Sequence, residues 1–146
     1  MPRHVYECPV RWADIDSLGH VNNVAYVDYM QEARVDMLAI HPGDTGRYAL
    51  GEGVVVVRHE VEFVRPLVFR FAPVRVEIWV EDVRAGSFTL RYRIGDRDQD
   101  TGQDRDEGTV YCRAATVLAP YVFAEERPRR LSPQERATLE RFRDAG

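Results

Sequence analysis

The chain has 146 residues, of which 45% are hydrophobic, and a formal net charge of -4 at pH 7. This length predicts a single domain spanning residues 1–146, with enough apolar residues for one core. The acidic balance argues against long-range attraction to nucleic acid or to an anionic membrane. All 20 basic residues are arginine, so guanidinium groups and backbone amides would have to bind any phosphate group.

The lack of a recognisable targeting signal and the small number of cysteines favour a cytoplasmic protein. The first residues lack the apolar stretch of a secretory signal peptide, and no apolar run approaches the roughly 20 residues of a membrane-spanning helix. Cys8 and Cys112 lie far apart, each in a strand-like run. We therefore expect two buried, reduced thiols rather than a disulfide or a metal site.

The first predicted elements are a strand and one long helix. Residues 5–12 contain Val, Tyr and Trp in a strand-like mixture, and a helix is expected over residues 24–40. Apolar residues recur there at helical spacing, namely at Val24, Val27, Met30, Ala33, Met37 and Leu38. Asn22 or Asn23 can cap the start of this helix, and the Pro-Gly pair at 42–43 should end it.

Four long strand candidates follow, over residues 54–64, 74–83, 87–94 and 109–118. Short polar turns join them, which predicts an antiparallel sheet with the lone helix on one face, an α+β arrangement. Near the end of the chain, Ser132-Pro-Gln-Glu135 forms a capping box. A short terminal helix is therefore expected over about residues 133–143.

The loop before the long helix is dense in polar side chains, namely Asp14, Asp16, Ser17, His20, Asn22 and Asn23. A helix N-terminus points free N–H groups at such a loop and stabilises a developing oxyanion. Asp16 then suits a nucleophile or general base acting on a carbonyl group. Two alternatives stay open: the residues only build a turn and cap the helix, or Asp14, Asp16 and His20 bind a metal, although no metal signature matches.

The run Asp16-Ser-Leu-Gly-His-Val-Asn-Asn-Val-Ala-Tyr26, with Tyr29 and Glu32-Ala-Arg34, resembles the signature of the 4-hydroxybenzoyl-CoA thioesterase family, especially its long-chain acyl-CoA branch. The resemblance continues at Phe63-Val-Arg-Pro66 and at Arg84-Ala-Gly-Ser87-Phe88. It implies a hotdog fold, in which an antiparallel sheet wraps one long helix. It also implies a homodimer or homotetramer with active sites between subunits, and no metal or other cofactor.

Carried over residue by residue, the resemblance makes Asp16 the catalytic carboxylate of an acyl-CoA thioesterase that hydrolyses a fatty or aryl acyl-CoA. The backbone N–H of Asn23 would polarise the thioester carbonyl, while Asp14 matches an acidic position that is not catalytic. His20 agrees with the long-chain acyl branch and either orients Asp16 or the substrate, or makes a structural hydrogen bond.

Arg84 and Ser87 match positions that contact CoA in similar proteins, although neighbouring basic residues are replaced here by Ala85 and Gly86. Residues of a second chain near 59–63 are expected to line the acyl pocket. Two other functions remain open: hydrolysis of a thioester on an acyl-carrier protein, and acyl-CoA binding without catalysis.

Two charged runs have simpler explanations than a ligand site. The run Arg127-Pro-Arg-Arg130 could meet CoA phosphates, but a solvated basic face is favoured. A calcium-loop template is matched at four acidic positions, Asp96, Asp98, Asp100 and Glu107. Thr101 replaces the glycine that this template requires, so a polar hairpin loop is predicted instead.

Overall fold

The structure is a computed structural model that describes residues 3–40, 53–97 and 108–144. Its elements in chain order are β1 (His4–Cys8), the 3-10 turn η1 (Trp12–Asp14), α1 (Asn23–Ile40), β2 (Val54–Phe63), β3 (Val74–Val83), β4 (Phe88–Gly95), β5 (Val110–Val122), the 3-10 turn η2 (Phe123–Glu125), β6 (Arg127–Pro128) and α2 (Pro133–Glu140). None of the helices in these ranges is long and apolar enough to cross a membrane.

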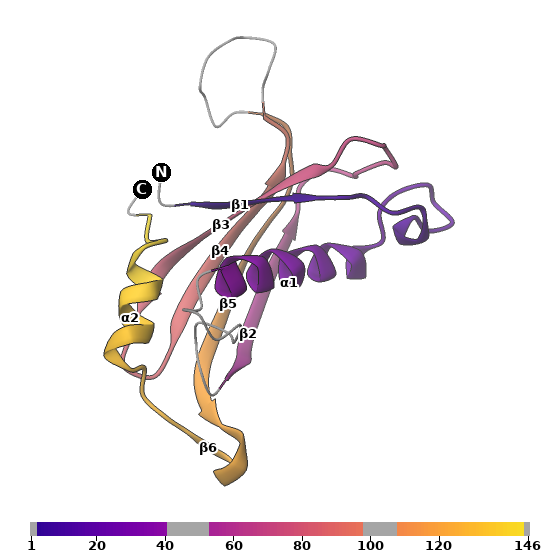
Figure 1. Cartoon of the computed structure of the whole chain (residues 1–146). Coiled ribbons are helices and arrows are strands. Elements are labelled where there is room, and N and C mark those ends of the chain that lie inside the picture. Colours follow the sequence, from indigo (N-terminus) through magenta and orange to yellow (C-terminus); the bar gives the residue numbers. More distant parts are fainter. Residues whose placement is uncertain (1–2, 41–52, 98–107, 145–146) are drawn as a thin grey trace.

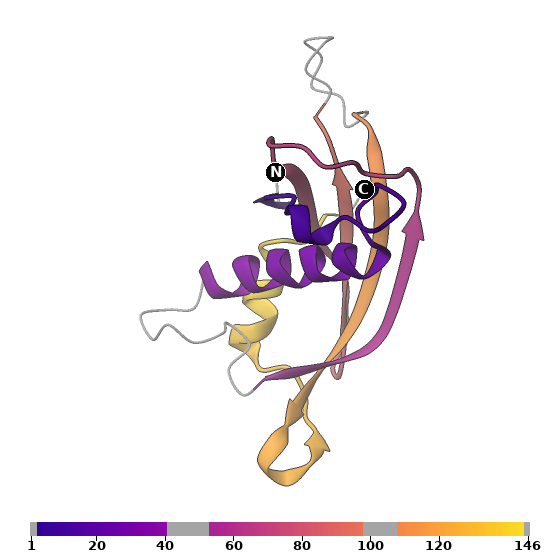
Figure 2. The ribbon, with the colours of Figure 1, turned by 90° about the vertical axis from the view of Figure 1, so that its right-hand side faces the viewer.

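The strands form one antiparallel sheet in the order β1-β3-β4-β5-β2, with the short β6 paired to β5. The sheet curls around α1, and α2 lies beside β3 (Figure 1). Seen from the side, the curvature leaves α1 on the inner face of the sheet (Figure 2). This is the predicted hotdog arrangement, with one long helix, a wrapped antiparallel sheet and a short terminal helix.

The core lies between α1 and the inner face of the sheet. From Met30 onward, α1 follows the predicted spacing, because Met30, Ala33 and Met37 are all fully buried. They belong to one apolar cluster with strand residues such as Ile78 and Leu90. Helical periodicity therefore identified the buried stripe over this half of α1.

The first turns of α1 depart from the prediction. Val24 and Val27, expected in the core, are 63% and 37% exposed. Tyr26 and Tyr29 are buried instead, and their hydroxyl groups make hydrogen bonds to partners outside the helix. Two apolar side chains are thus turned outward close to the loop that precedes α1.

Several boundaries differ from those expected. The first strand ends at Cys8 rather than at residue 12, because the chain turns into η1 after Pro9. The last long strand continues to Val122, and its Pro120 lies opposite the first residue of β2. The capping box of α2 is confirmed by the Ser132 and Glu135 hydrogen bonds, but α2 stops at residue 140 instead of about 143. The predicted helix stop at 42–43 lies outside the described residues.

Candidate active site

Asp16 lies at the base of a tight turn. Its N–H donates to the His20 carbonyl oxygen at 3.0 Å, and the Gly19 N–H donates to the Asp16 carbonyl oxygen at 3.0 Å. The Asp16 Oδ1 atom accepts from the Leu18 N–H at 2.9 Å. Gly19 has φ 83, a left-handed conformation that favours glycine. The backbone therefore holds Asp16 opposite His20, and the Asp16 Oδ2 atom has no hydrogen bond within the described ranges.

The start of α1 leaves one amide available beside this turn. Asn22 caps the helix, since its Oδ1 accepts from the Val24 N–H and its carbonyl oxygen from the Ala25 N–H, both at 2.9 Å. Asn23 is the first helical residue and is exposed. Among the residues placed by the structure, none accepts a hydrogen bond from the Asn23 N–H. This amide is free to bind a substrate oxygen at the positive end of the helix dipole.

Asp14 anchors the loop rather than facing a ligand. It is 6% exposed, and its Oδ2 accepts from the Tyr29 hydroxyl at 2.6 Å. Arg11 donates to the same carboxylate from its backbone N–H, its Nε and its Nη2. Burial alone would raise the pKa of Asp14, but the hydrogen bonds from Arg11 and Tyr29 outweigh it and hold the pKa below its ordinary value. Sequence reasoning missed this role, although Tyr29 stands in the motif.

A second anchor ties the loop to the segment after β2. The Val21 N–H donates to the Leu67 carbonyl oxygen at 2.7 Å, and the Leu67 N–H donates to the Tyr26 hydroxyl at 3.2 Å. The Tyr26 ring packs edge-on against Phe63, with 5.4 Å between ring centroids. The loop with Asp16 is thus held between the first turns of α1 and the Phe63 end of β2.

Within one chain, Arg84 and Ser87 lie far from the loop with Asp16. They close the β3–β4 hairpin, where the Arg84 N–H donates to the Ser87 carbonyl oxygen at 2.8 Å. The loop follows the end of β1 that pairs with the start of β3, whereas the hairpin follows the other end of β3. The ten residues of β3 span about 30 Å. The two groups of predicted site residues therefore lie at opposite ends of the sheet (Figure 1).

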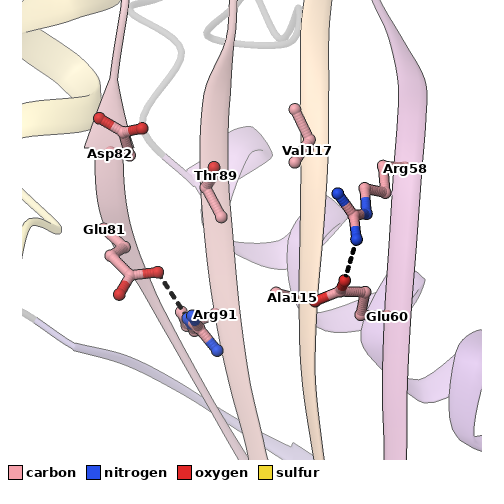
Figure 3. Close-up of a pocket in the computed structure, with 8 residues that line it drawn as sticks. All are labelled: Arg58, Glu60, Glu81, Asp82, Thr89, Arg91, Ala115 and Val117. Carbon is pink, nitrogen blue, oxygen red and sulfur yellow. Dashed lines mark hydrogen bonds and ion pairs between the residues drawn. The ribbon is translucent and has the colours of Figure 1, made fainter.

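A charged pocket of about 420 Å³ lies on the sheet face turned away from α1 (Figure 3). Its lining comprises Arg58, Glu60, Glu81, Asp82, Thr89, Arg91, Ala115 and Val117. The Arg91 Nε donates to Glu81 at 2.5 Å, and Arg58 pairs with Glu60. Since these charges compensate one another and face away from the loop with Asp16, the pocket is not part of the candidate site.

The basic run before α2 is only partly a solvated face. Arg127 is exposed and pairs with Glu125, as expected for such a face. Arg129, in contrast, donates to both carboxylate oxygens of Glu135 at 2.7 and 2.9 Å and to the Gly53 carbonyl oxygen at 3.1 Å. Its guanidinium group holds α2 in place, so Arg129 is a poor candidate for CoA phosphates.

The acidic run after β4 is described only at its start. Asp96 accepts two hydrogen bonds from Arg70 and one, at 2.6 Å, from the Tyr111 hydroxyl. Burial raises the pKa of Asp96, but these hydrogen bonds outweigh it, and the pKa lies below its ordinary value. The other three acidic positions of the calcium template are outside the described residues. Asp96 itself serves to join the segment after β2 to β5.

Comparison with known proteins finds relatives that are named as thioesterases. The profile of the thioesterase-like superfamily matches residues 10–141. A Pseudomonas aeruginosa structure, provisionally named a thioesterase, is 31% identical over 93% of this chain and 97% of its own, with a TM-score of 0.75. A Xanthomonas campestris protein, provisionally named an acyl-CoA thioesterase, is 34% identical over 80% of this chain and 90% of its own, with a TM-score of 0.63.

A Thermus thermophilus thioesterase, whose structure contains coenzyme A and zinc, is 24% identical over 95% of this chain and 92% of its own, with a TM-score of 0.73. A search of curated proteins finds no match. The solved structures agree with the predicted hotdog fold. These relatives support the superfamily but do not establish the 4-hydroxybenzoyl-CoA thioesterase family, or its long-chain acyl-CoA branch, that the sequence motif resembles.

Proposed function

The chain belongs to the thioesterase-like superfamily of thioester hydrolases, and we propose that it hydrolyses an acyl-CoA to the free acid and CoA with Asp16 as the catalytic carboxylate. One observation carries this proposal. A carboxylate fixed by its own turn, with one oxygen free of hydrogen bonds in the described chain, lies in the loop that leads into the available amide of Asn23. A thioester needs this combination of a nucleophile or base and an oxyanion donor.

The start of α1 activates the thioester carbonyl group for attack. The thioester carbonyl oxygen accepts a hydrogen bond from the Asn23 N–H, where the helix dipole favours negative charge. Negative charge grows on that oxygen as the carbonyl carbon becomes tetrahedral. Because the amide is already oriented by the Asn22 cap, little reorganisation is required when this charge appears.

Asp16 supplies the other half by one of two routes. In the first, its carboxylate attacks the carbonyl carbon, the C–S bond breaks, the CoA thiolate leaves, and water hydrolyses the resulting mixed anhydride. In the second, Asp16 takes a proton from a water molecule whose oxygen attacks the carbonyl carbon, and the departing thiolate is then protonated. A single turnover in heavy-oxygen water separates the routes. Attack of water on the Asp16 carbonyl of the anhydride leaves the label in Asp16, whereas the second route places the label only in the released acid.

His20 is a positioning residue in this proposal. Its backbone carbonyl accepts the Asp16 N–H, so it fixes the turn whatever its imidazole contacts. We expect the imidazole to orient Asp16 or the substrate from the opposite side of the turn. Since Asp16 and the Asn23 amide supply the reacting groups, we expect no metal or prosthetic group to be required.

We expect the enzyme to act as a homodimer, or as a homotetramer built from dimers. Within one chain, Arg84 and Ser87 are separated from the loop with Asp16 by the length of β3, about 30 Å. One acyl-CoA can therefore contact the hairpin and the loop together only if they come from two copies. β2 lies at an edge of the described sheet and carries the exposed apolar residues Val56, Val57 and Phe63. A second copy placed along this edge would cover them.

Changing Arg84 to Gln should raise KM for acyl-CoA about tenfold while leaving kcat nearly unchanged. The Arg84 side chain is exposed and donates to Asp82 at 3.0 Å, so its loss should not disturb the fold. Guanidinium groups bind phosphates through paired hydrogen bonds. KM for an acyl N-acetylcysteamine thioester, which lacks the CoA phosphates, should be unaffected. An equal rise for both substrates would contradict phosphate binding by Arg84.

The proposed activity is tested by measuring CoA release from saturated and aryl acyl-CoAs with a thiol reagent. Burial raises the pKa of Cys8 and of Cys112 to about 12, so the thiols of the protein will contribute little background. The same acyl groups should be offered on an acyl-carrier protein. We expect the CoA esters to be hydrolysed faster. Faster hydrolysis of the carrier-protein esters would identify the acyl-carrier protein, rather than CoA, as the acyl donor. Binding of acyl-CoA without hydrolysis would identify a non-catalytic protein.

A further inference from the structure

His59 is a polar residue on the inner face of the sheet. It lies in β2 directly opposite Thr116 of β5, which lies opposite Leu90 of β4. Side chains of directly opposed residues share a face of an antiparallel sheet. Thr116 and Leu90 are fully buried on the side of α1, whereas the neighbours of His59 in sequence, Arg58 and Glu60, project from the other face (Figure 3).

The hydrogen bonding of His59 is incomplete. Its Nδ1 atom is 2.7 Å from the Thr116 hydroxyl oxygen. Its Nε2 atom is shielded from solvent and has no hydrogen-bond partner among the residues that the structure describes. A buried polar atom without a partner is costly, and native proteins rarely retain one without a reason. The missing partner of Nε2 is therefore a candidate ligand atom.

The surroundings of His59 favour a neutral ring. Burial and, second, the positive charge of Arg34 lower the pKa of His59. Arg34 reaches down from α1 and donates from Nη1 to the Tyr92 hydroxyl at 3.0 Å. A neutral imidazole has one donor and one acceptor nitrogen, and the bond to Thr116 leaves either role to Nε2.

Two elements lead from the candidate active site to His59. Phe63, which packs on Tyr26 beside the loop with Asp16, lies four residues after His59, about 13 Å away along β2. On α1, Tyr26 and Arg34 are about 12 Å apart. On the same face of β2, the partly exposed apolar side chains of Val61 and Phe63 lead from His59 toward the Asp16 loop. An acyl chain placed along this strip would meet apolar surface first and a polar end afterwards.

We propose that His59 and Thr116 form a specificity site for an acyl group that carries a hydroxyl group remote from the thioester. A hydroxyl group both donates and accepts, so it satisfies Nε2 in either tautomer of His59. A site built to hydrogen-bond a substrate hydroxyl discriminates against the analogue that lacks it, because the polar atom of the protein is then left unpaired. This inference rests on the proposed hydrolysis of acyl-CoA and refines its substrate class.

The test compares kcat/KM for octanoyl-, decanoyl- and dodecanoyl-CoA with that for their ω-hydroxy counterparts, using the purified full chain. At the length that brings the hydroxyl group to His59, the wild type should prefer the hydroxylated substrate about tenfold. His59→Phe should reduce this ratio to about one, whereas His59→Gln, which retains a donor and an acceptor, should preserve a preference. Glu60→Gln, on the opposite face of β2, should keep the wild-type ratio.

Circular dichroism establishes that each variant is folded, and His59→Leu replaces His59→Phe as the deciding variant if the latter does not fold. Equal rates for both wild-type series at every length would overturn the inference and leave the proposed function standing. An unchanged ratio in the folded apolar variant would do the same. If the wild type hydrolyses neither series, nor any other acyl-CoA, the proposed function and the specificity site fall together.

Discussion

Replacing Asp16 by Asn should lower kcat for acyl-CoA hydrolysis by about 10²–10⁴-fold and leave the protein folded. The amide has the shape of the carboxylate, and its oxygen can still accept the hydrogen bond from the Leu18 N–H that closes the turn. It cannot attack the carbonyl carbon or take a proton from water. Because the Asn23 amide and the acyl-binding surface are unchanged, KM should vary much less than kcat.

The matched control is Asp28→Asn, the same chemical change at an exposed position of α1. This variant should retain wild-type kcat, since Asp28 is outside the loop that carries the reacting groups. The decisive comparison is kcat under saturating substrate, with the unfolding transition of each variant recorded in parallel. Asp16→Asn protein that is folded and turns over acyl-CoA at the wild-type rate would remove Asp16 from the reaction.

The fold was predictable because its signals are local. Period-two and helical patterns lie within single segments, and turn residues such as Gly86 separate them. The capping box around Ser132 is also local and was correctly identified. The orientation of the first turns of α1 was not, because Val24 and Val27 satisfy the same spacing rule as the buried residues. The inward face is instead taken by Tyr26 and Tyr29, which lie at helical spacing from Met30 and bond to groups outside the helix.

The candidate site was likewise predictable only in part. The placement of Asp16 beside a helix start follows from the order of elements along the chain, but its catalytic role rests on the family motif. The anchoring of Asp14 by Tyr29 and the clamp between Arg129 and Glu135 depend on pairings that a sequence does not display. The sequence placed His59 only at the start of a stretch, residues 59–63, expected to line the acyl pocket of a second chain, and gave it no role of its own. Its unpaired nitrogen becomes visible once Thr116 is seen opposite it.

Changing Asp14 to Ala should lower the free energy of unfolding by about 2–3 kcal/mol, because the buried Tyr29 hydroxyl loses its acceptor. Arg11 is exposed and can be solvated, so its loss adds less. Urea unfolding at neutral pH measures the difference, with Asp28→Asn as the exposed control. A change below about 0.5 kcal/mol, the range of ordinary surface substitutions, would contradict an anchoring role.

The pH dependence of this effect has a definite sign. The pKa of Asp14 is lower in the folded chain than the ordinary value of about 4 expected in the unfolded chain. The ionised carboxylate therefore contributes stability above that ordinary value, and the contribution is lost as pH falls through the folded pKa. Asp14→Asn removes this titration. The difference in free energy of unfolding between wild type and Asp14→Asn should thus be largest near neutral pH and shrink below about pH 4. A difference that stays constant on acidification would show that the charge of Asp14 does not hold the loop.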